Sequence, residues 1–226
     1  MDVTLPEPLN SLIGKLETKA VTNLFGGPGT GKTNFCMLAM IDCARKGGKV
    51  VYMDSEGGLS FERMKQLAHD HEALLSRVEL LEPHTFAEQG EMIRKLGRAQ
   101  ADLIVVDSMV ALYRLEYGEE KKSSERMDHV RELSRQLSIL SAIARTKDIP
   151  VLVTSHMFRG WDNGEPDVVG GDMMKYWSKT IIYLERTGRM SERKATVTKH
   201  RFAPEGGNVK FQLVSDGIKP SGFRIF

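Results

Sequence analysis

The segment Gly-Gly-Pro-Gly-Thr-Gly-Lys-Thr at residues 26–33 constrains the fold of this chain more than any other feature. It satisfies the spacing G-x-x-x-x-G-K-[ST], follows an apolar run at residues 21–25 and precedes an amphipathic stretch at residues 32–45. Glycines let backbone N–H groups turn inward around a phosphate without Cβ clashes, and a helix N-terminus adds the positive end of its dipole. The pattern therefore predicts a strand, a phosphate-binding loop (P-loop) and a helix in succession.

The residue types of this loop predict how ATP and Mg²⁺ would be bound. Lys32 is expected to reach the β- and γ-phosphates, and the Thr33 hydroxyl is expected to bind Mg²⁺. A carboxylate on the metal side should end a buried strand, and Asp107 ends the apolar run at residues 103–107, although an aspartate there can also merely cap a strand. The remaining contacts to the nucleotide are expected from Gly26, Gly27, Pro28, Gly29, Thr30 and Gly31.

The residue that activates water is expected outside the Asp107 segment. Many ATPases carry a glutamate directly after the metal-side aspartate, but here that residue is Ser108. Glu56 follows the predicted strand at residues 49–54, at the edge where doubly wound sheets open their binding crevice. We therefore predict that Glu56 orients the attacking water; the alternative is a solvated loop glutamate.

Strands and helices alternate along most of the chain, which predicts an α/β domain with a mostly parallel central sheet flanked by helices. From residue 179 onward, three strand-like runs separated by glycine turns predict a C-terminal antiparallel extension. We expect one domain over residues 1–226. The predicted strands are residues 21–25, 49–54, 78–81, 103–107 and 150–155, and the predicted helices are residues 32–45, 61–75, 86–96 and 124–147. The last helix should bury one apolar stripe: Met127, Val130, Leu133, Leu137, Leu140 and Ala144.

Composition excludes several classes of protein. With 41% hydrophobic and 27% charged residues in 226, the chain is neither a disordered tail nor a fibrous repeat, and its formal net charge of +2 indicates no general affinity for nucleic acid. No apolar window is long enough to span a membrane, and the N-terminus lacks a signal-peptide core. Cys36 and Cys43 are expected to be buried thiols in a reducing cytoplasm.

Four segments together resemble the RecA/RadA recombinase superfamily. The P-loop, D-S-E-G-G-L-S-F-E-R (residues 54–63), L-I-V-V-D-S (residues 103–108) and V-L-V-T-S-H (residues 151–156) occur in that family's order. The resemblance implies a RecA-type ATPase core, a catalytic glutamate at Glu56 and an arginine against the adenine at Arg63. It places His156 where recombinases carry a glutamine that senses the γ-phosphate. The alternatives are an exposed Arg63 in an ion pair and a packed loop histidine.

Two features of the sequence differ from the active archaeal recombinases of this superfamily. The P-loop begins at Gly26, which leaves no room for the separate N-terminal DNA-binding domain of the active archaeal recombinases, and residues 1–22 lack their aromatic polymerisation motif. The stretch Lys199-His200-Arg201 is similar to one in shorter archaeal paralogues. This similarity implies that Lys199 and Arg201 act catalytically on a neighbouring subunit's nucleotide; the alternative is a solvent-exposed basic strand face.

The charge pattern predicts weak contact with DNA, single-stranded DNA being favoured. Residues 113–126 carry four basic and four acidic side chains, and residues 159–171 carry one basic and three acidic side chains, so neither loop is basic. Four aromatic side chains in these regions could stack on bases: Tyr113, Tyr117, Phe158 and Trp161. The basic stretch lies instead at residues 186–201, with six basic side chains and one acidic side chain.

These observations predict a weakly hydrolysing, Mg²⁺-dependent ATP-binding protein of DNA repair and homologous recombination, acting as a DNA-binding regulator or mediator of the main archaeal recombinase. The resemblance implies two protein partners, the main archaeal recombinase and the Holliday-junction resolvase. Assembly of the chain into a homo-oligomer is left open. One alternative is an autonomous recombinase or motor whose ATPase is stimulated by DNA. The other is a signalling ATPase of the KaiC type, which would bind no DNA.

Overall fold

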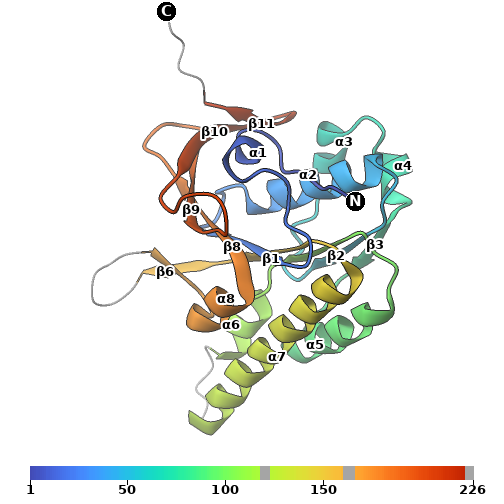
Figure 1. Cartoon of the computed structure of the whole chain (residues 1–226), viewed down its shortest axis with the longest axis vertical. Helices are drawn as coiled ribbons and strands as arrows, with labels where there is room; N and C mark the ends of the chain where they lie inside the picture. The colour runs from blue at the N-terminus through green and yellow to red at the C-terminus, as the bar shows by residue number, and fades with distance from the viewer. Residues whose placement is uncertain (118–122, 160–165, 222–226) are drawn as a thin grey trace, which may run out of the picture.

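A mixed sheet of nine strands forms the centre of the computed structural model, which describes residues 1–117, 123–159 and 166–221 (Figure 1). The strand order is β11-β10-β9-β8-β1-β5-β4-β2-β3, and the six strands from β8 to β3 run parallel. The strands of this sheet are β1 (Val21–Gly26), β2 (Val50–Asp54), β3 (Val78–Leu81), β4 (Leu103–Asp107), β5 (Val151–Ser155), β8 (Ser178–Arg186), β9 (Glu192–Lys199), β10 (Asn208–Val214) and β11 (Gly217–Pro220). A separate antiparallel pair consists of β6 (Met157–Arg159) and β7 (Pro166–Val168).

Helices cover both faces of the sheet (Figure 1). One face carries α1 (Leu9–Ile13), α2 (Lys32–Arg45), α3 (Phe61–Leu67) and α4 (His71–Leu75). The other carries α5 (Phe86–Lys95) with a 3₁₀ turn (Leu96–Arg98), α6 (Ala111–Tyr117), α7 (Ser123–Lys147) and α8 (Gly171–Trp177). Because side chains alternate along a strand, Val50 and Tyr52 of β2 pack into the first core and Val51 and Met53 into the second.

The predicted fold class is confirmed, including the C-terminal antiparallel strands, which pair in the order β8, β9, β10 and β11. This extension continues the parallel sheet directly, since β8 pairs in parallel with β1 and antiparallel with β9. As a result, the last strands of the chain lie beside the strand that precedes the P-loop.

Three details differ from the sequence-based expectation. The predicted helix at residues 61–75 is two helices, because Ala68 adopts an extended conformation (φ −148°) and ends α3. The short elements α1, α6, α8, β6, β7 and β11 were not predicted, since each spans seven residues or fewer and shows no clear periodicity. The apolar stripe of α7 is buried at Leu133, Leu137, Leu140 and Ala144, whereas Met127 is 54% exposed. Figure 1 shows the reason: the first turns of α7 extend past the sheet.

The structure agrees with the sequence on the burial of the two cysteines and on the lack of a described membrane-spanning helix. Cys36 and Cys43 are buried free thiols on α2, as expected. Burial raises the pKa of Cys43 to about 12, so this thiol is protonated and unreactive at neutral pH. Within residues 1–117, 123–159 and 166–221, no helix is both long and apolar enough to cross a membrane.

Candidate nucleotide site

The P-loop connects β1 to α2 and has the conformation that its glycines permit. Gly29 and Gly31 have φ angles of 67° and 102°, in the left-handed region that favours glycine, and Gly31 is the N-cap of α2. The Thr30 hydroxyl donates to the carbonyl oxygen of Gly27 at 2.8 Å and closes the turn. The loop therefore has the nest shape in which backbone N–H groups can surround a phosphate.

Lys32 lies folded into this loop. Its side chain is 9% exposed, and Nζ donates to the carbonyl oxygens of Gly26 and Gly27 at 3.0 Å each. Burial lowers the pKa of Lys32, while the negative charges of Asp107 and Glu56 act in the opposite direction. The ammonium group is therefore held at the loop by backbone carbonyls and lies within the electrostatic field of both predicted acidic residues.

Asp107 is the last residue of β4, and its buried carboxylate accepts hydrogen bonds from three hydroxyl groups. Thr154 and Tyr52 donate to it from the neighbouring strands, at 2.5 Å and 3.1 Å, and the Thr33 hydroxyl also hydrogen-bonds with it. Burial raises the pKa of Asp107, an effect that these hydrogen bonds partly offset. A threonine hydroxyl beside a carboxylate offers the oxygen ligands that Mg²⁺ prefers, so Thr33 and Asp107 fit the predicted metal side.

No cluster of three or more histidine, cysteine or acidic side chains able to hold a metal was found in the described part of the chain. A magnesium ion at a P-loop is typically held by one or two protein oxygens together with phosphate oxygens and water. Thr33 and Asp107 meet that requirement without a larger cluster of acidic side chains.

Glu56 follows β2 and directly contacts His156, the predicted γ-phosphate sensor. Its Oε1 is 2.7 Å from Nε2 of His156, which follows β5. This hydrogen bond holds the pKa of Glu56 below its usual value despite partial burial. The carboxyl ends of β2, β4 and β5 thus bring Glu56, Asp107 and His156 to the same edge of the sheet as the P-loop, as parallel strands require.

Asp54 positions the segment that carries Glu56, a role that sequence reasoning missed. Its buried carboxylate accepts hydrogen bonds from the backbone N–H groups of Glu56, Gly58 and Leu59 at 2.8–3.1 Å. Ser55 also binds across to Ser108, donating to its carbonyl oxygen at 2.7 Å. The sequence signal was available: an aspartate at a strand end followed by glycines often accepts hydrogen bonds from the backbone of the turn that follows it.

Arg63 lies where α3 meets the turn between β10 and β11. Its guanidinium donates to the side chain of Asn34 at 2.8 Å and to the backbone carbonyl oxygens of Ser215 and Val214 at 2.6 Å and 3.0 Å. The alternative of an exposed arginine in an ion pair does not describe it, since Arg63 donates these hydrogen bonds to uncharged groups and is partly withdrawn from water, which lowers its pKa. Its contact with adenine stays a prediction.

Comparison with known proteins identifies the family. A family model described as Rad51 matches residues 7–221. A DNA repair and recombination protein RadB of Methanococcus maripaludis (strain C5) is 41% identical over 217 residues, covering 95% of this chain and 96% of the relative. This chain belongs to the RadB family. A RadB of Methanobrevibacter smithii is 40% identical, with 92% and 91% covered, and a crystal structure of the RadB recombinase superposes with a TM-score of 0.81 at 33% identity, covering 96% of this chain and 97% of that one.

In this RadB-family chain, Lys199 and Arg201 lie away from the P-loop of their own subunit. Lys199 Nζ donates to the carbonyl oxygen of Lys175 at the end of α8, and Arg201 forms an ion pair with Glu17. Strand β9 ends at Lys199, so the two side chains do not share a regular strand face. Their expected action on a neighbouring subunit stays a prediction.

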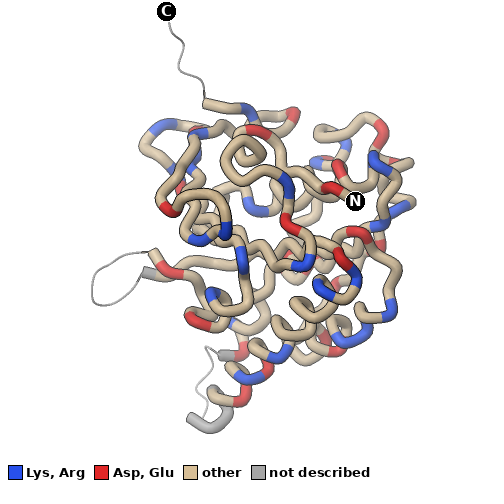
Figure 2. Tube along the Cα trace, in the orientation of Figure 1, with Lys and Arg blue, Asp and Glu red and all other residues tan. Residues whose placement is uncertain are grey.

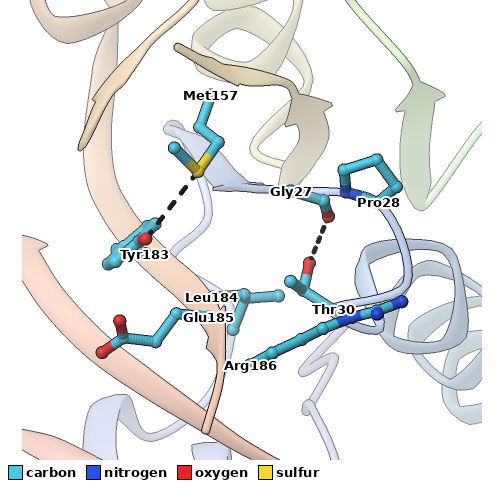
Figure 3. Close-up of a pocket in the computed structure, with 8 residues that line it drawn as sticks. All are labelled: Gly27, Pro28, Thr30, Met157, Tyr183, Leu184, Glu185 and Arg186. Carbon is cyan, nitrogen blue, oxygen red and sulfur yellow. Dashed lines mark hydrogen bonds between the residues drawn. The ribbon is translucent and has the colours of Figure 1, made fainter. Parts of the chain in front are cut away.

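Two other arginines lie at the P-loop instead, and sequence reasoning did not place them there. Arg193 of β9 donates from Nε to the carbonyl oxygen of Gly29 at 2.9 Å, and the Arg186 guanidinium of β8 contacts Gly29. Beside them is a pocket of about 420 Å³, lined by Gly27, Pro28, Thr30, Met157, Tyr183, Leu184, Glu185 and Arg186 (Figure 3). No sequence motif marks these residues; strand register alone brings them to the loop.

The segments expected to face DNA are only partly described. Tyr113 is 7% exposed and packs against Phe86, so it belongs to the core, whereas Phe158 on β6 is 42% exposed. Trp161 and the Tyr117 side chain lie outside the described residues. Basic and acidic residues are interspersed along the described part of the Cα trace (Figure 2).

Proposed function

We propose that this chain is a weakly hydrolysing ATP-binding protein of DNA repair and homologous recombination, and that it regulates or mediates the main archaeal recombinase. The observation that carries this proposal is the convergence of Lys32, Asp107 and Glu56 at one P-loop. A glycine-rich structural turn would require neither the buried lysine nor the two carboxylates that influence its charge.

Each of these side chains has a defined role in the proposed site. Lys32 would neutralise charge on the β- and γ-phosphates, and Thr33 with Asp107 would hold Mg²⁺. When bound, the metal supplies charge neutralisation at the phosphate oxygens. The buried hydrogen bonds from Tyr52 and Thr154 keep the Asp107 carboxylate in one orientation.

Glu56 would accept the proton of the attacking water while the water oxygen bonds to the γ-phosphorus and the bond to the β–γ bridging oxygen breaks. The His156 contact stabilises the ionised carboxylate and lowers its pKa, which makes Glu56 ready to accept a hydrogen bond but a weak base. Because a weak base removes a proton from water slowly, this pKa supports the proposal of slow ATP hydrolysis. The same contact links the ATP site to β6, the strand that follows His156.

Two observations support a role in DNA repair and recombination with only weak contact to DNA. The relatives named above are DNA repair and recombination proteins by name. In addition, three cations of the basic stretch are engaged within the chain: Lys199 with the Lys175 carbonyl, Arg201 with Glu17, and Lys194 with Glu185. We therefore propose weak contact with single-stranded DNA; the recombinase and the Holliday-junction resolvase are partners by family resemblance.

The test is steady-state ATP hydrolysis by the purified chain, with and without single-stranded DNA. Lys32→Ala serves as the blank, and Glu56→Gln should keep Mg²⁺–ATP binding while losing hydrolysis by at least about 100-fold. We expect a slow wild-type rate that DNA changes little. A large rate stimulated by DNA would favour the autonomous recombinase or motor instead. Binding of no DNA at any salt concentration, with phosphorylation of the chain itself, would favour a signalling ATPase.

A further inference from the structure

Two arginines on adjacent strands stand directly opposite each other beside the P-loop. In the antiparallel register of β8 and β9, Arg186 pairs with Arg193. Like charges at directly opposed positions destabilise a sheet, so such a pair is costly unless an anion lies nearby. The two positions are therefore unusual places for cations with a purely structural role.

The contacts of both side chains are directed at the loop. Arg193 donates to the Gly29 carbonyl oxygen at 2.9 Å and to its neighbour's carbonyl, that of Glu192, at 3.0 Å. The Arg186 guanidinium occupies the space that a side chain at position 29 would take, so only glycine permits this approach. Both cations thus lie against the backbone whose N–H groups form the phosphate nest.

The described residues give neither arginine a carboxylate partner. The two adjacent glutamates are bound elsewhere: Glu185 pairs with Lys194, and Glu192 is held by Thr187, Ser221 and Lys210. Burial and the neighbouring Arg186 charge both lower the pKa of Arg193. The two guanidinium groups therefore place about two positive charges beside the P-loop, without a carboxylate partner among the described residues.

The pocket beside Arg186 gives an anion access to this charge. It has Gly27, Pro28 and Thr30 on one wall and Arg186 on another, and Met157 also lines it (Figure 3). Met157 directly follows His156, so one wall of the pocket belongs to the segment that also contacts Glu56. Guanidinium groups suit this place because they bind phosphate oxygens through two parallel N–H bonds.

We propose that Arg186 and Arg193 bind the terminal phosphates of the nucleotide held by the P-loop of their own chain. The inference rests on the proposed function and adds a cationic clamp supplied within one chain. It differs from the expected role of Lys199 and Arg201, which would act on a neighbouring subunit. The clamp would favour ATP over ADP, since the γ-phosphate adds the charge nearest the pair.

Calorimetric binding of Mg²⁺–ATP and Mg²⁺–ADP tests the clamp on four variants of the full chain: Arg186→Met, Arg186→Lys, Arg193→Met and Arg189→Met. Arg189 is exposed at the turn of the same hairpin and is the matched control. We expect each methionine substitution in the clamp to weaken ATP binding about tenfold and ADP binding less. Arg186→Lys should recover part of the loss, and Arg189→Met should match the wild type. Melting temperatures identify any variant that fails to fold.

Mixing two defective chains, at an ATP concentration too low to fill the weakened site of Arg186→Met, separates a clamp within one chain from a clamp between chains. Lys32→Ala lacks a working loop and Arg186→Met lacks the clamp, so their mixture can recover ATP hydrolysis only if Arg186 acts on a neighbour's nucleotide. We expect no recovery; recovery would overturn the assignment. ATP binding that keeps its wild-type strength in Arg186→Met and Arg193→Met would overturn the clamp alone. Equal, negligible binding by the wild type and Lys32→Ala would overturn the proposed function and the clamp with it.

Discussion

Asp107 shows how a single residue can be unfavourable for stability and well suited to metal binding. Its carboxylate is 4% exposed, and burial raises its pKa above the ordinary value of 3.8. The charged form is therefore less stable in the folded chain than in the unfolded chain. Consequently the free energy of unfolding falls as pH rises from about 3.8 through the raised pKa, and the loss persists at neutral pH.

Asp107→Asn should remove this cost while abolishing the proposed contact with Mg²⁺. Without nucleotide at pH 7, we expect the variant to be at least as stable as the wild type, because the amide carries no charge that burial penalises. The gain should shrink toward pH 4, where the wild-type carboxyl becomes protonated. Urea unfolding at both pH values measures it. Asp216→Asn is the control: that exposed carboxylate has a lowered pKa, so its removal should give no gain, and a less stable Asp107→Asn at pH 7 would contradict the argument.

At the scale of elements, the P-loop is enclosed by strands from the far end of the chain. A side chain at position 26 would collide with the backbone carbonyl of Leu184 on β8, and one at position 31 would press on Leu213 of β10. Glycine at position 26 is thus required by the backbone of β8, whereas at position 31 it is favoured mainly by the positive φ of 102°, since the end of the Leu213 side chain could shift. A Cβ atom at Gly27, in the same loop, would meet no other atom within 4 Å.

Gly26→Ala and Gly27→Ala form a matched pair that tests this enclosure. Gly26→Ala must push β8 away from β1, and overpacking against rigid backbone should lower the free energy of unfolding by about 1–3 kcal/mol. Gly27→Ala should change it by less than about 0.5 kcal/mol. Chemical denaturation of both variants without nucleotide checks the difference. Equal stabilities would show that β8 does not constrain the loop.

Sequence periodicity predicts the long elements well because each repeats one pattern over many residues. The five predicted parallel strands and the helix α2 are present, and the convergence of Lys32, Asp107 and Glu56 follows from strand ends in a parallel sheet. Short segments such as α6 and α8 carry too few turns for a periodic signal. The positions of Arg186 and Arg193 depend on strand pairing between residues far apart in sequence, which no local pattern encodes.

For the whole molecule, the distribution of charge limits binding to DNA. The formal net charge is +2, and basic and acidic residues are interspersed along the described part of the Cα trace (Figure 2). Few phosphates can then be neutralised at once, and each contributes about −0.7 to the slope of log K against log salt for a single strand. Neither a strongly steered encounter nor tight nonspecific binding is expected.

We therefore expect a shallow salt dependence for single-stranded DNA, with a slope no steeper than about −2, measured by fluorescence anisotropy between 50 and 200 mM salt, about the range over which such slopes are usually compared. Arg189→Met should make the slope shallower by about 0.7 if this arginine contacts a phosphate. A slope near −5 would reveal a basic surface that the described residues do not form, and would favour the motor or recombinase alternative.

The pairing of β8 with β1 delays the formation of the P-loop's surroundings during folding. Residues 26–31 touch residues 184, 186, 193 and 213, so the loop encoded near the start of the chain acquires its walls from residues translated more than 150 positions later. Contacts at such separations form late, because the intervening chain must first be ordered. A nascent chain on the ribosome thus carries the loop's sequence long before its shape, so the proposed nucleotide site would be complete only once nearly all of the chain has emerged.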